Sequence, residues 1–315
     1  MSASPPSPVS LSRRILIAII WIGWAALVLV TALGFTAAWI PAFDLVNAAR
    51  PALALIAVAL LLIAIPLRQG SLIRPTAGLA LLQVGLLLLP WARAAASTSG
   101  PASLRLVTFD LGAGNERFDD IAEFILGAGA DVVLLQEVSC GAADRLIPKL
   151  RPSYANVYVS AEGCAGQAVL AKRPWSALGQ VITATAKPLV VSARLQWGNT
   201  GFVLSSVRLA DPFAPVAQAS DIERLRAHLA TQGPMQIVAG AFNIPPFAWK
   251  FAQLQGSGFG QHATFLATWP GQWSTPLVLL DNVFSTEGIA SVHVAVGPPL
   301  GSDHRPLIAD IALGK

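Results

Sequence analysis

The stretch VAGAFNIPP, from Val238 to Pro246, raises the central question of this sequence. Its apolar first half predicts a buried strand. The two prolines predict the turn that ends it, because proline cannot donate a hydrogen bond to a sheet. Strands that end this way often carry a carboxylate directly before a Phe-Asn pair, and Ala241 occupies that position here. The surrounding sequence has to indicate whether a site has lost its acid or never existed.

Strand-like runs recur through the last two thirds of the chain, with two helical segments between them. Helices are predicted at 118–126, where Phe118, Ile121 and Ile125 share one face, and at 220–230. The predicted strands are 104–110, 131–138, 167–171, 189–195, 202–207, 236–241, 277–284, 291–296 and 307–311. Many strands with few helices favour two sheets packed face to face with helices outside, an α/β sandwich.

The first part of the chain has a different composition. Of the 315 residues, 54% are hydrophobic and 12% are charged, and the mean hydropathy is +0.60. The apolar residues gather in segments 15–40, 51–67 and 75–91, which predict three transmembrane helices. A signal peptide is the alternative for the first segment, although this segment is longer than the apolar region of a signal peptide. We therefore predict a membrane anchor over 1–93, a small, polar linker over 94–102 and a globular domain over 103–315.

Arginine residues predict the orientation of the three helices. Arg13 and Arg14 precede the first segment, and Arg68 and Arg74 lie between the second and third. Because positive charge stays on the cytoplasmic side, the N-terminus is predicted to be cytoplasmic. Three crossings then place the globular domain outside the cytoplasm, in the periplasm if the membrane is a bacterial inner membrane.

The charge balance argues against a nucleic-acid partner. The whole chain carries +4 with a pI near 9.4, but six of its 21 basic residues and one of its 17 acidic residues precede Ser103. The globular part therefore holds 15 basic and 16 acidic residues, without the basic excess that binds a phosphate backbone.

Two cysteines, Cys140 and Cys164, lie in the predicted exported domain. In an oxidising compartment such a pair usually forms a disulfide bond. Two buried, unpaired thiols are the alternative.

Polar residues follow several of the predicted strands, where strand ends can build a site on one rim. Each of them alone is explained equally well as a solvated strand end. The set comprises Asp110, Asn115, Glu137, Arg208, Asn243, Asp281, Asp303 and His304.

The order and wording of these motifs give a more specific interpretation. TFD with a following Asn, LQE, VRL, GAFN, LDNVF and GSDHRP resemble the endonuclease/exonuclease/phosphatase superfamily over 104–313. The TWP at Thr268 to Pro270 and the three apolar segments resemble the bacterial membrane-anchored branch of that family. The resemblance implies a four-layer α/β sandwich of the DNase I type that hydrolyses phosphate esters with Mg²⁺ or Mn²⁺.

The resemblance also implies roles for the polar residues. Glu137 would be the principal metal ligand, and Asp303 would orient His304 toward the scissile phosphate. The implied roles are catalysis by Asn243, Asp281, Asp303 and His304, metal binding by Glu137 and Asp110, and phosphate binding by Arg208 and Asn115.

Three positions depart from the family pattern. Ala241 replaces the Asp that activates the attacking water, Arg208 replaces a His, and Asp110 replaces an Asn. Three replacements favour natural loss of catalysis over a single engineered change. Two hypotheses follow: a phosphoesterase with impaired or lost catalysis that acts on phosphorylated lipids or small phosphate esters, or a non-catalytic binding or scaffolding subunit of a membrane protein complex. Arg208 in a plain surface ion pair is the alternative to a phosphate contact.

Overall fold

The computed structural model describes residues 10–92, 103–160, 164–182, 187–262 and 266–313. The chain divides into two compact units, one formed by 1–90 with Phe247–Trp249 and the other by 91–246 with 250–315. The predicted linker, 94–102, lies outside the described residues.

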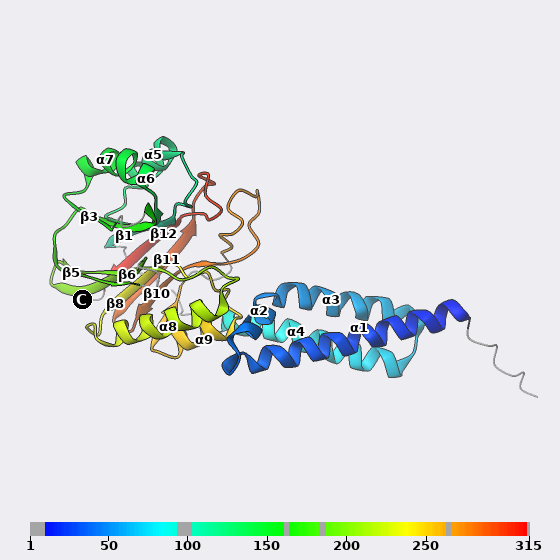
Figure 1. The fold of residues 1–315 in the computed structure, drawn as a ribbon. Helices are drawn as coiled ribbons and strands as arrows, with labels where there is room; N and C mark the ends of the chain where they lie inside the picture. Colours follow the sequence, from blue (N-terminus) through cyan, green and yellow to red (C-terminus); the bar gives the residue numbers. More distant parts are fainter. Residues whose placement is uncertain (1–9, 93–102, 161–163, 183–186, 263–265, 314–315) are drawn as a thin grey trace, which may run out of the picture. The chain divides into compact units, whose positions relative to one another are not determined.

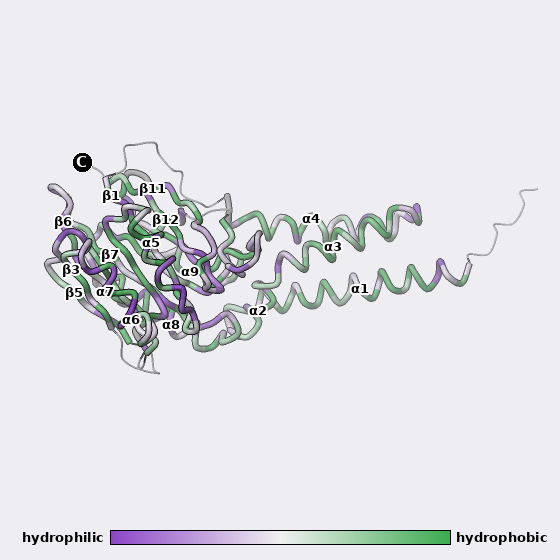
Figure 2. Tube along the Cα trace, turned by 90° about the horizontal axis from the view of Figure 1, so that it is seen from above, coloured by the Kyte–Doolittle hydropathy of each residue, from purple (hydrophilic) through white to green (hydrophobic). Residues whose placement is uncertain are grey.

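Three long apolar helices dominate the first unit (Figure 1). They are α1 (Leu11–Phe35), α3 (Arg50–Ala64) and α4 (Gly70–Ala92), and the short α2 (Asp44–Ala48) precedes α3. Figure 2 shows them hydrophobic along most of their length. The helical segments Leu11–Ala38, Arg50–Leu67 and Gly70–Pro90 are long and apolar enough to cross a membrane. The first helix begins before residue 15 because the side chain of Ser10 caps it by accepting a hydrogen bond from the Arg13 backbone N–H.

A buried polar network joins these helices. Gln83 of α4 donates to Thr31 Oγ1 of α1 at 2.5 Å, and Arg50 of α3 donates to Gln83 Oε1 at 3.1 Å. Arg50 also donates to Asn47 Oδ1 at 2.6 Å. These side chains are all buried. Hydrogen bonds of this kind stabilise the packing of apolar helices against one another.

The second unit is a sandwich of two six-stranded sheets. The first sheet has the order β11-β12-β1-β2-β4-β3 and the second has the order β5-β6-β7-β8-β10-β9. The first sheet comprises β1 (Leu104–Asp110), β2 (Val132–Val138), β3 (Asn156–Ser160), β4 (Gly166–Ala171), β11 (Ile289–Val296) and β12 (Leu307–Leu313). The second comprises β5 (Trp175–Ile182), β6 (Pro188–Trp197), β7 (Thr200–Arg208), β8 (Gln236–Ala241), β9 (Phe259–Gln261) and β10 (Asp281–Thr286).

Helices cover the outer face of each sheet, which completes the predicted α/β sandwich. Figure 1 shows α5, α6 and α7 outside the first sheet and α8 and α9 outside the second. Their bounds are α5 (Phe118–Ala128), α6 (Cys140–Arg145), α7 (Ile147–Leu150), α8 (Pro215–Ala230) and α9 (Trp249–Gln255). A disulfide bond joins Cys140, at the start of α6, to Cys164, with their Cα atoms 4.7 Å apart.

Strand alternation builds two separate cores. In β1, Leu104 and Leu106 pack between the sheets, whereas Val107 and Phe109 pack under the helices. Successive side chains of a strand point to opposite faces, so every second residue of β1 belongs to the inter-sheet core. Asp110 continues the series of Leu104 and Leu106, and its side chain therefore lies where the inter-sheet core ends.

Polar side chains also cross between the sheets. Gln136 of β2 donates to Ser206 Oγ of β7 at 2.9 Å, and Ser206 donates to Gln167 Oε1 of β4 at 2.6 Å. All three side chains are fully buried. A buried network with its groups hydrogen-bonded fixes the alignment of the two sheets and of the strand ends beyond it.

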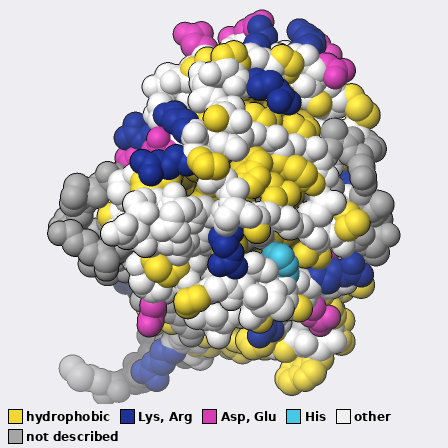
Figure 3. All heavy atoms as spheres, turned by 90° about the vertical axis from the view of Figure 1, so that its left-hand side faces the viewer, with side chains coloured by type: hydrophobic (Ala, Val, Ile, Leu, Met, Phe, Trp, Pro, Cys, Tyr) yellow, Lys and Arg dark blue, Asp and Glu magenta, His cyan; other side chains and the backbone are white. Residues whose placement is uncertain are grey.

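The sequence missed three strands, β3, β5 and β9. The strand predicted at 277–284 begins later, at Asp281, because Val278 instead forms an isolated bridge with Trp269. On the face of the second unit that Figure 3 shows, Lys and Arg side chains lie scattered among hydrophobic and uncharged ones.

Candidate functional site

Strand ends from both sheets meet at one edge of the sandwich, which we call the rim. Three of its residues lie side by side in the second sheet: Ala241 pairs with Arg208 of β7 on one side and with Asp281 of β10 on the other. All three continue the inter-sheet faces of their strands, as Asp110 does in the first sheet. The rim therefore presents a cation, a methyl group and a carboxylate in a row.

Glycine before Ala241 allows β7 and β8 to approach closely. The backbone of Gly240 has φ +145°, and a Cβ atom there would lie 2.0 Å from the carbonyl oxygen of Val207. No other residue fits this position without moving the strand that carries Arg208.

Glu137 reaches the rim through a break in strand alternation. Regular alternation would point it away from the neighbouring sheet, but Glu137 has φ +51° and the pairing of β2 with β4 shifts between Leu135 and Val138. Such a bulge redirects a side chain, and left-handed backbone in a non-glycine residue is strained and is often found at functional sites. Glu137 Oε2 accepts a hydrogen bond from the backbone N–H of Ala113 at 2.9 Å.

Arg208 contacts three carboxylates. Its Nη2 donates to Glu137 Oε1 and, at 3.2 Å, to Asp211 Oδ1, while its Nε lies 3.5 Å from Asp110 Oδ2. The Arg208 side chain is 18% exposed, so these ion pairs are partly shielded from water. Burial alone would lower the pKa of Arg208, but Asp110 and Glu137 raise it. The guanidinium is therefore fixed in its charged form by its neighbours. The structure thus shows Arg208 in ion pairs, the alternative that the sequence left open beside the predicted phosphate contact.

Asp110 is a buried carboxyl at the base of the rim. Its side chain is 2% exposed, and Oδ1 accepts a hydrogen bond from the backbone N–H of Gly112 at 3.1 Å. Burial raises the pKa of Asp110 to about 6, although the charge of His304 opposes this rise. Burial disfavours the charged form of a carboxyl group, whereas a nearby positive charge favours it.

The carboxylate that orients His304 is Asp281 rather than the predicted Asp303. His304 Nδ1 lies 2.7 Å from Asp281 Oδ2, and both side chains are almost completely buried. Asp303 instead accepts a hydrogen bond from Trp269 Nε1 at 3.4 Å. Burial would lower the pKa of His304, but the charge and the hydrogen bond of Asp281 raise it to about 10. His304 therefore carries a proton at neutral pH and can donate to an anion but cannot act as a base.

The two asparagines of the predicted site make backbone contacts. Asn115 Nδ2 donates to the carbonyl oxygens of both Leu111 and Leu300, which uses both amide hydrogens and leaves none for the predicted phosphate contact. Asn243 has φ +55°, and its Nδ2 donates to the carbonyl oxygen of Leu209 at 3.0 Å. Asn243 therefore ties the end of β8 to the end of β7.

Sequence reasoning missed two hydroxyl groups that support the rim. Ser302 Oγ donates to the carbonyl oxygen of Asp110 at 2.7 Å and accepts the backbone N–H of His304 at 3.0 Å, so it ties together two rim segments. The hydroxyl of Thr268 accepts the backbone N–H groups of Leu280 and Asp281 at 3.2 and 3.3 Å. Thr268 belongs to the TWP motif, which the sequence analysis singled out without assigning a role to this threonine.

The rim does not fit the metal that the resemblance implies. Among the described residues, no group of three or more His, Cys, Asp or Glu side chains is arranged to hold a metal ion. The two predicted ligands, Asp110 and Glu137, are instead both paired with Arg208.

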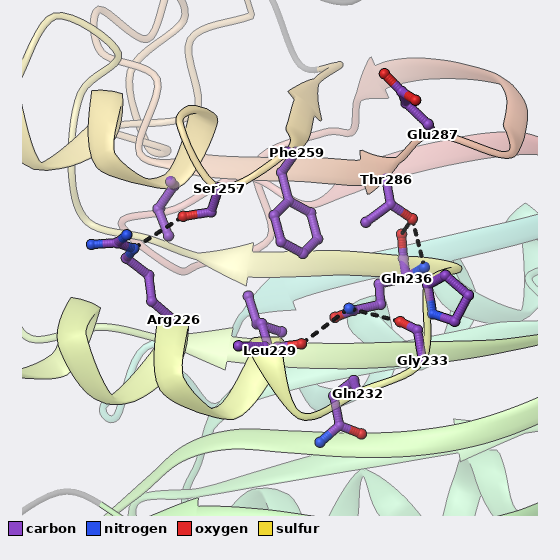
Figure 4. A pocket seen from close by; sticks show the side chains of 13 residues that line it. Arg226, Leu229, Gln232, Gly233, Gln236, Ser257, Phe259, Thr286 and Glu287 are labelled. Atoms are coloured by element: carbon purple, nitrogen blue, oxygen red, sulfur yellow. Dashed lines mark hydrogen bonds between the residues drawn. The ribbon is translucent and has the colours of Figure 1, made fainter.

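A cavity of about 750 Å³ lies elsewhere on the second sheet, between α8, α9 and the strands β8, β9 and β10. Figure 4 shows Gln236, which donates to the carbonyl oxygens of Leu229 and Gly233 at 3.1 and 2.8 Å. Gln236 begins β8, whereas the rim lies at its other end, and no predicted site residue lines the cavity. The cavity and the rim are separate places.

Comparison with known proteins identifies a family. Residues 107–304 match the Endonuclease/Exonuclease/phosphatase family. No curated protein matches the chain.

Solved structures show the same fold at low sequence identity. A functionally unknown protein from Enterococcus faecalis has a TM-score of 0.58 and 16% identity, with 67% of this chain and 100% of that chain covered. A mutant beta toxin from Staphylococcus aureus, solved with bound magnesium ions, has a TM-score of 0.57 and 15% identity, with 68% of this chain and 100% of that chain covered. An endonuclease/exonuclease/phosphatase from Beutenbergia cavernae has a TM-score of 0.54 and 18% identity, with 68% of this chain and 72% of that chain covered. These identities support a shared fold rather than a shared substrate.

Proposed function

This chain belongs to the endonuclease/exonuclease/phosphatase family, and we propose that it is a membrane-anchored member in which hydrolysis of phosphate esters is impaired or lost. The row Arg208, Ala241 and Asp281 carries the proposal. The resemblance assigns the middle position to the acid that activates water, and a methyl group cannot accept a proton. Ala241 is also fully buried, so its own surface offers no polar group to a water molecule.

Asp110 does not replace the missing base. A pKa of about 6 would suit a general base, but such a base must reach both the water and the substrate. The Asp110 carboxyl is 2% exposed, accepts a backbone hydrogen bond and is ion-paired with Arg208. His304 cannot replace the base either, because it already carries a proton at neutral pH.

We propose that the three apolar helices anchor the protein in a bacterial inner membrane, with the sandwich domain in the periplasm. Their length and composition support the crossings, and the arginines at 13, 14, 68 and 74 support this orientation. The Cys140–Cys164 disulfide bond supports it independently, because such bonds persist in oxidising compartments.

The partner that we propose is another membrane protein, which makes this chain a non-catalytic binding subunit. Two segments beside the rim expose large apolar side chains: Phe213 is 83% exposed, Trp273 54% and Leu277 63%. Phe213 lies two residues after Asp211, which contacts Arg208. The segment of Trp273 is held near His304 by the next residue, Arg305, whose Nη2 donates to the carbonyl oxygen of Trp273 at 2.5 Å. Exposed aromatic side chains of this kind are enriched where proteins meet.

Charge supports a protein partner over a nucleic acid. The domain has one more acidic than basic residue, and the basic side chains visible in Figure 3 form no single stripe. A phosphorylated lipid or a small phosphate ester is the alternative ligand. Its phosphate would have to compete with Asp110 and Glu137 for Arg208 and with Asp281 for His304.

Two assays on the full chain in mild detergent test the proposal. We expect no EDTA-sensitive hydrolysis of a phosphodiester or a phosphomonoester with Mg²⁺ or Mn²⁺. A photo-crosslinking residue at Phe213 should capture a membrane protein in intact cells, and one at the exposed Leu126 of α5 serves as the control. EDTA-sensitive turnover would refute the loss of catalysis, and equal labelling at both positions would refute the binding surface.

A further inference from the structure

Arg208 lies between the two carboxylates that the family resemblance assigns to a metal ion. Its Nη2 contacts Glu137 Oε1 and its Nε lies 3.5 Å from Asp110 Oδ2. One guanidinium group thus contacts both predicted ligands from a position between the first and second sheets. A divalent cation shared by the same carboxylates would have to take that place.

The surroundings of this ion pair differ from those of a surface ion pair. The Asp110 side chain is 2% exposed, Arg208 18% and Glu137 21%, so the three groups are largely shielded from solvent. By contrast, the pair of Arg105 and Asp310 on the first sheet is 46% and 28% exposed. A buried carboxylate needs a positive partner, and leaving it unpaired is strongly unfavourable.

The backbone also directs both ligands to this point. The strained left-handed conformation of Glu137 brings its carboxylate to the rim, and strand alternation brings Asp110 there. Arg208 arrives from the other sheet as the last residue of β7. The guanidinium is planar and permanently charged, which suits it to bridge two fixed carboxylates.

We propose that Arg208 is a built-in replacement for the metal ion: its guanidinium neutralises Asp110 and Glu137, and the wild-type rim for that reason does not take up Mg²⁺ or Mn²⁺. Removing the charge of Arg208 should uncover a divalent-cation site, because carboxylate oxygens are the ligands that these hard cations prefer. The inference concerns cation binding alone and does not depend on the proposed loss of hydrolysis.

Mn²⁺ binding to the full chain in mild detergent tests the inference, with free Mn²⁺ measured by electron paramagnetic resonance. We expect Arg208→Ala and Arg208→Met to bind one Mn²⁺ at least about tenfold more tightly than wild type, since each removes the guanidinium that contacts Asp110 and Glu137. Arg208→Met keeps most of the side-chain volume, so it separates the effect of charge from that of packing if the alanine variant folds poorly. Arg208→Lys keeps the charge and should bind Mn²⁺ as weakly as wild type.

Two further variants locate the new site. Adding Glu137→Gln to Arg208→Met should abolish the gain, because it removes one of the two carboxylates. Arg105→Ala removes an arginine from the exposed pair with Asp310 and should gain nothing. Circular dichroism of each variant confirms that the domain remains folded.

Two results would overturn the inference: wild type binding Mn²⁺ as tightly as Arg208→Met, with both losing it on Glu137→Gln, or a folded Arg208→Met that gains no binding. These results are distinct from failure of the proposed function. Wild type that hydrolyses esters without binding Mn²⁺ would contradict the proposed function alone, whereas wild type that binds Mn²⁺ at the rim without turnover would contradict only this inference.

Discussion

The pair of His304 and Asp281 gives the most quantitative test of the rim. Replacing Asp281 with Asn removes the charge that keeps His304 protonated but leaves a side chain of nearly the same size. Both side chains are almost fully buried, with 2.7 Å between His304 Nδ1 and Asp281 Oδ2. Without Asp281, burial should leave the imidazole neutral at pH 7.

The size of the effect follows from the pKa of His304. Folding raises it from 6.5 to about 10, and each unit corresponds to 1.36 kcal/mol. A raised histidine pKa stabilises the fold fully below pH 6.5, and that contribution is lost as the pH rises toward 10. At pH 7 the pair should therefore contribute about 4 kcal/mol at most, and near pH 10.5 almost nothing.

Urea unfolding of the full chain in mild detergent, followed by tryptophan fluorescence at pH 7 and pH 10.5, measures this contribution. Asp281→Asn should lower the free energy of unfolding by several kcal/mol at pH 7 and by far less at pH 10.5. Asp310→Asn, which breaks the exposed pair with Arg105, is the control and should cost less than about 1 kcal/mol at both pH values. An equal loss for Asp281→Asn at the two pH values would refute the reasoning.

Three other changes test parts of the fold. Gly240→Ala should destabilise the sandwich by more than about 2 kcal/mol in urea unfolding, because its Cβ would lie 2.0 Å from the Val207 carbonyl oxygen; a loss below half that value would contradict the close contact. Cys140→Ser, which also frees Cys164, should lower the free energy of unfolding by about 3 kcal/mol when both proteins are measured without reductant. With reductant present, the variant and wild type should be equally stable. Gln83→Leu should weaken the helix bundle by about 0.6 to 1.7 kcal/mol in a detergent unfolding titration; an unchanged midpoint would rule out a stabilising network.

Much of the fold could be predicted because burial leaves a periodic signal. The strand at Leu104–Asp110 and the strand at Gln236–Ala241 have the predicted bounds. The three missed strands, β3, β5 and β9, all lie at sheet edges, where one side of the strand has no neighbour and fewer side chains are buried. β9 has only three residues, which is too short for alternation to be visible.

The site was harder to predict than the fold because its contacts join segments far apart in the sequence. The sequence identified Arg208 and Ala241 as departures from a motif. It did not predict that they pair with each other on neighbouring strands. It assigned Asp303 to orient His304 because the two are adjacent in the chain, whereas Asp281 is the side chain that reaches the ring. Nor does a sequence pattern reveal the bulge that redirects Glu137, since its signal is a backbone angle.

The most direct test of the account is whether catalysis can be restored. The full chain in mild detergent is compared with the Ala241→Asp, Arg208→His double variant in hydrolysis of a phosphodiester and a phosphomonoester with Mg²⁺ or Mn²⁺. We predict that wild type is silent and that the double variant hydrolyses at least one substrate in an EDTA-sensitive manner, because it regains both the base and an open metal position. EDTA-sensitive hydrolysis by wild type would contradict the account, since a rim with Ala241 and Arg208 would then still catalyse.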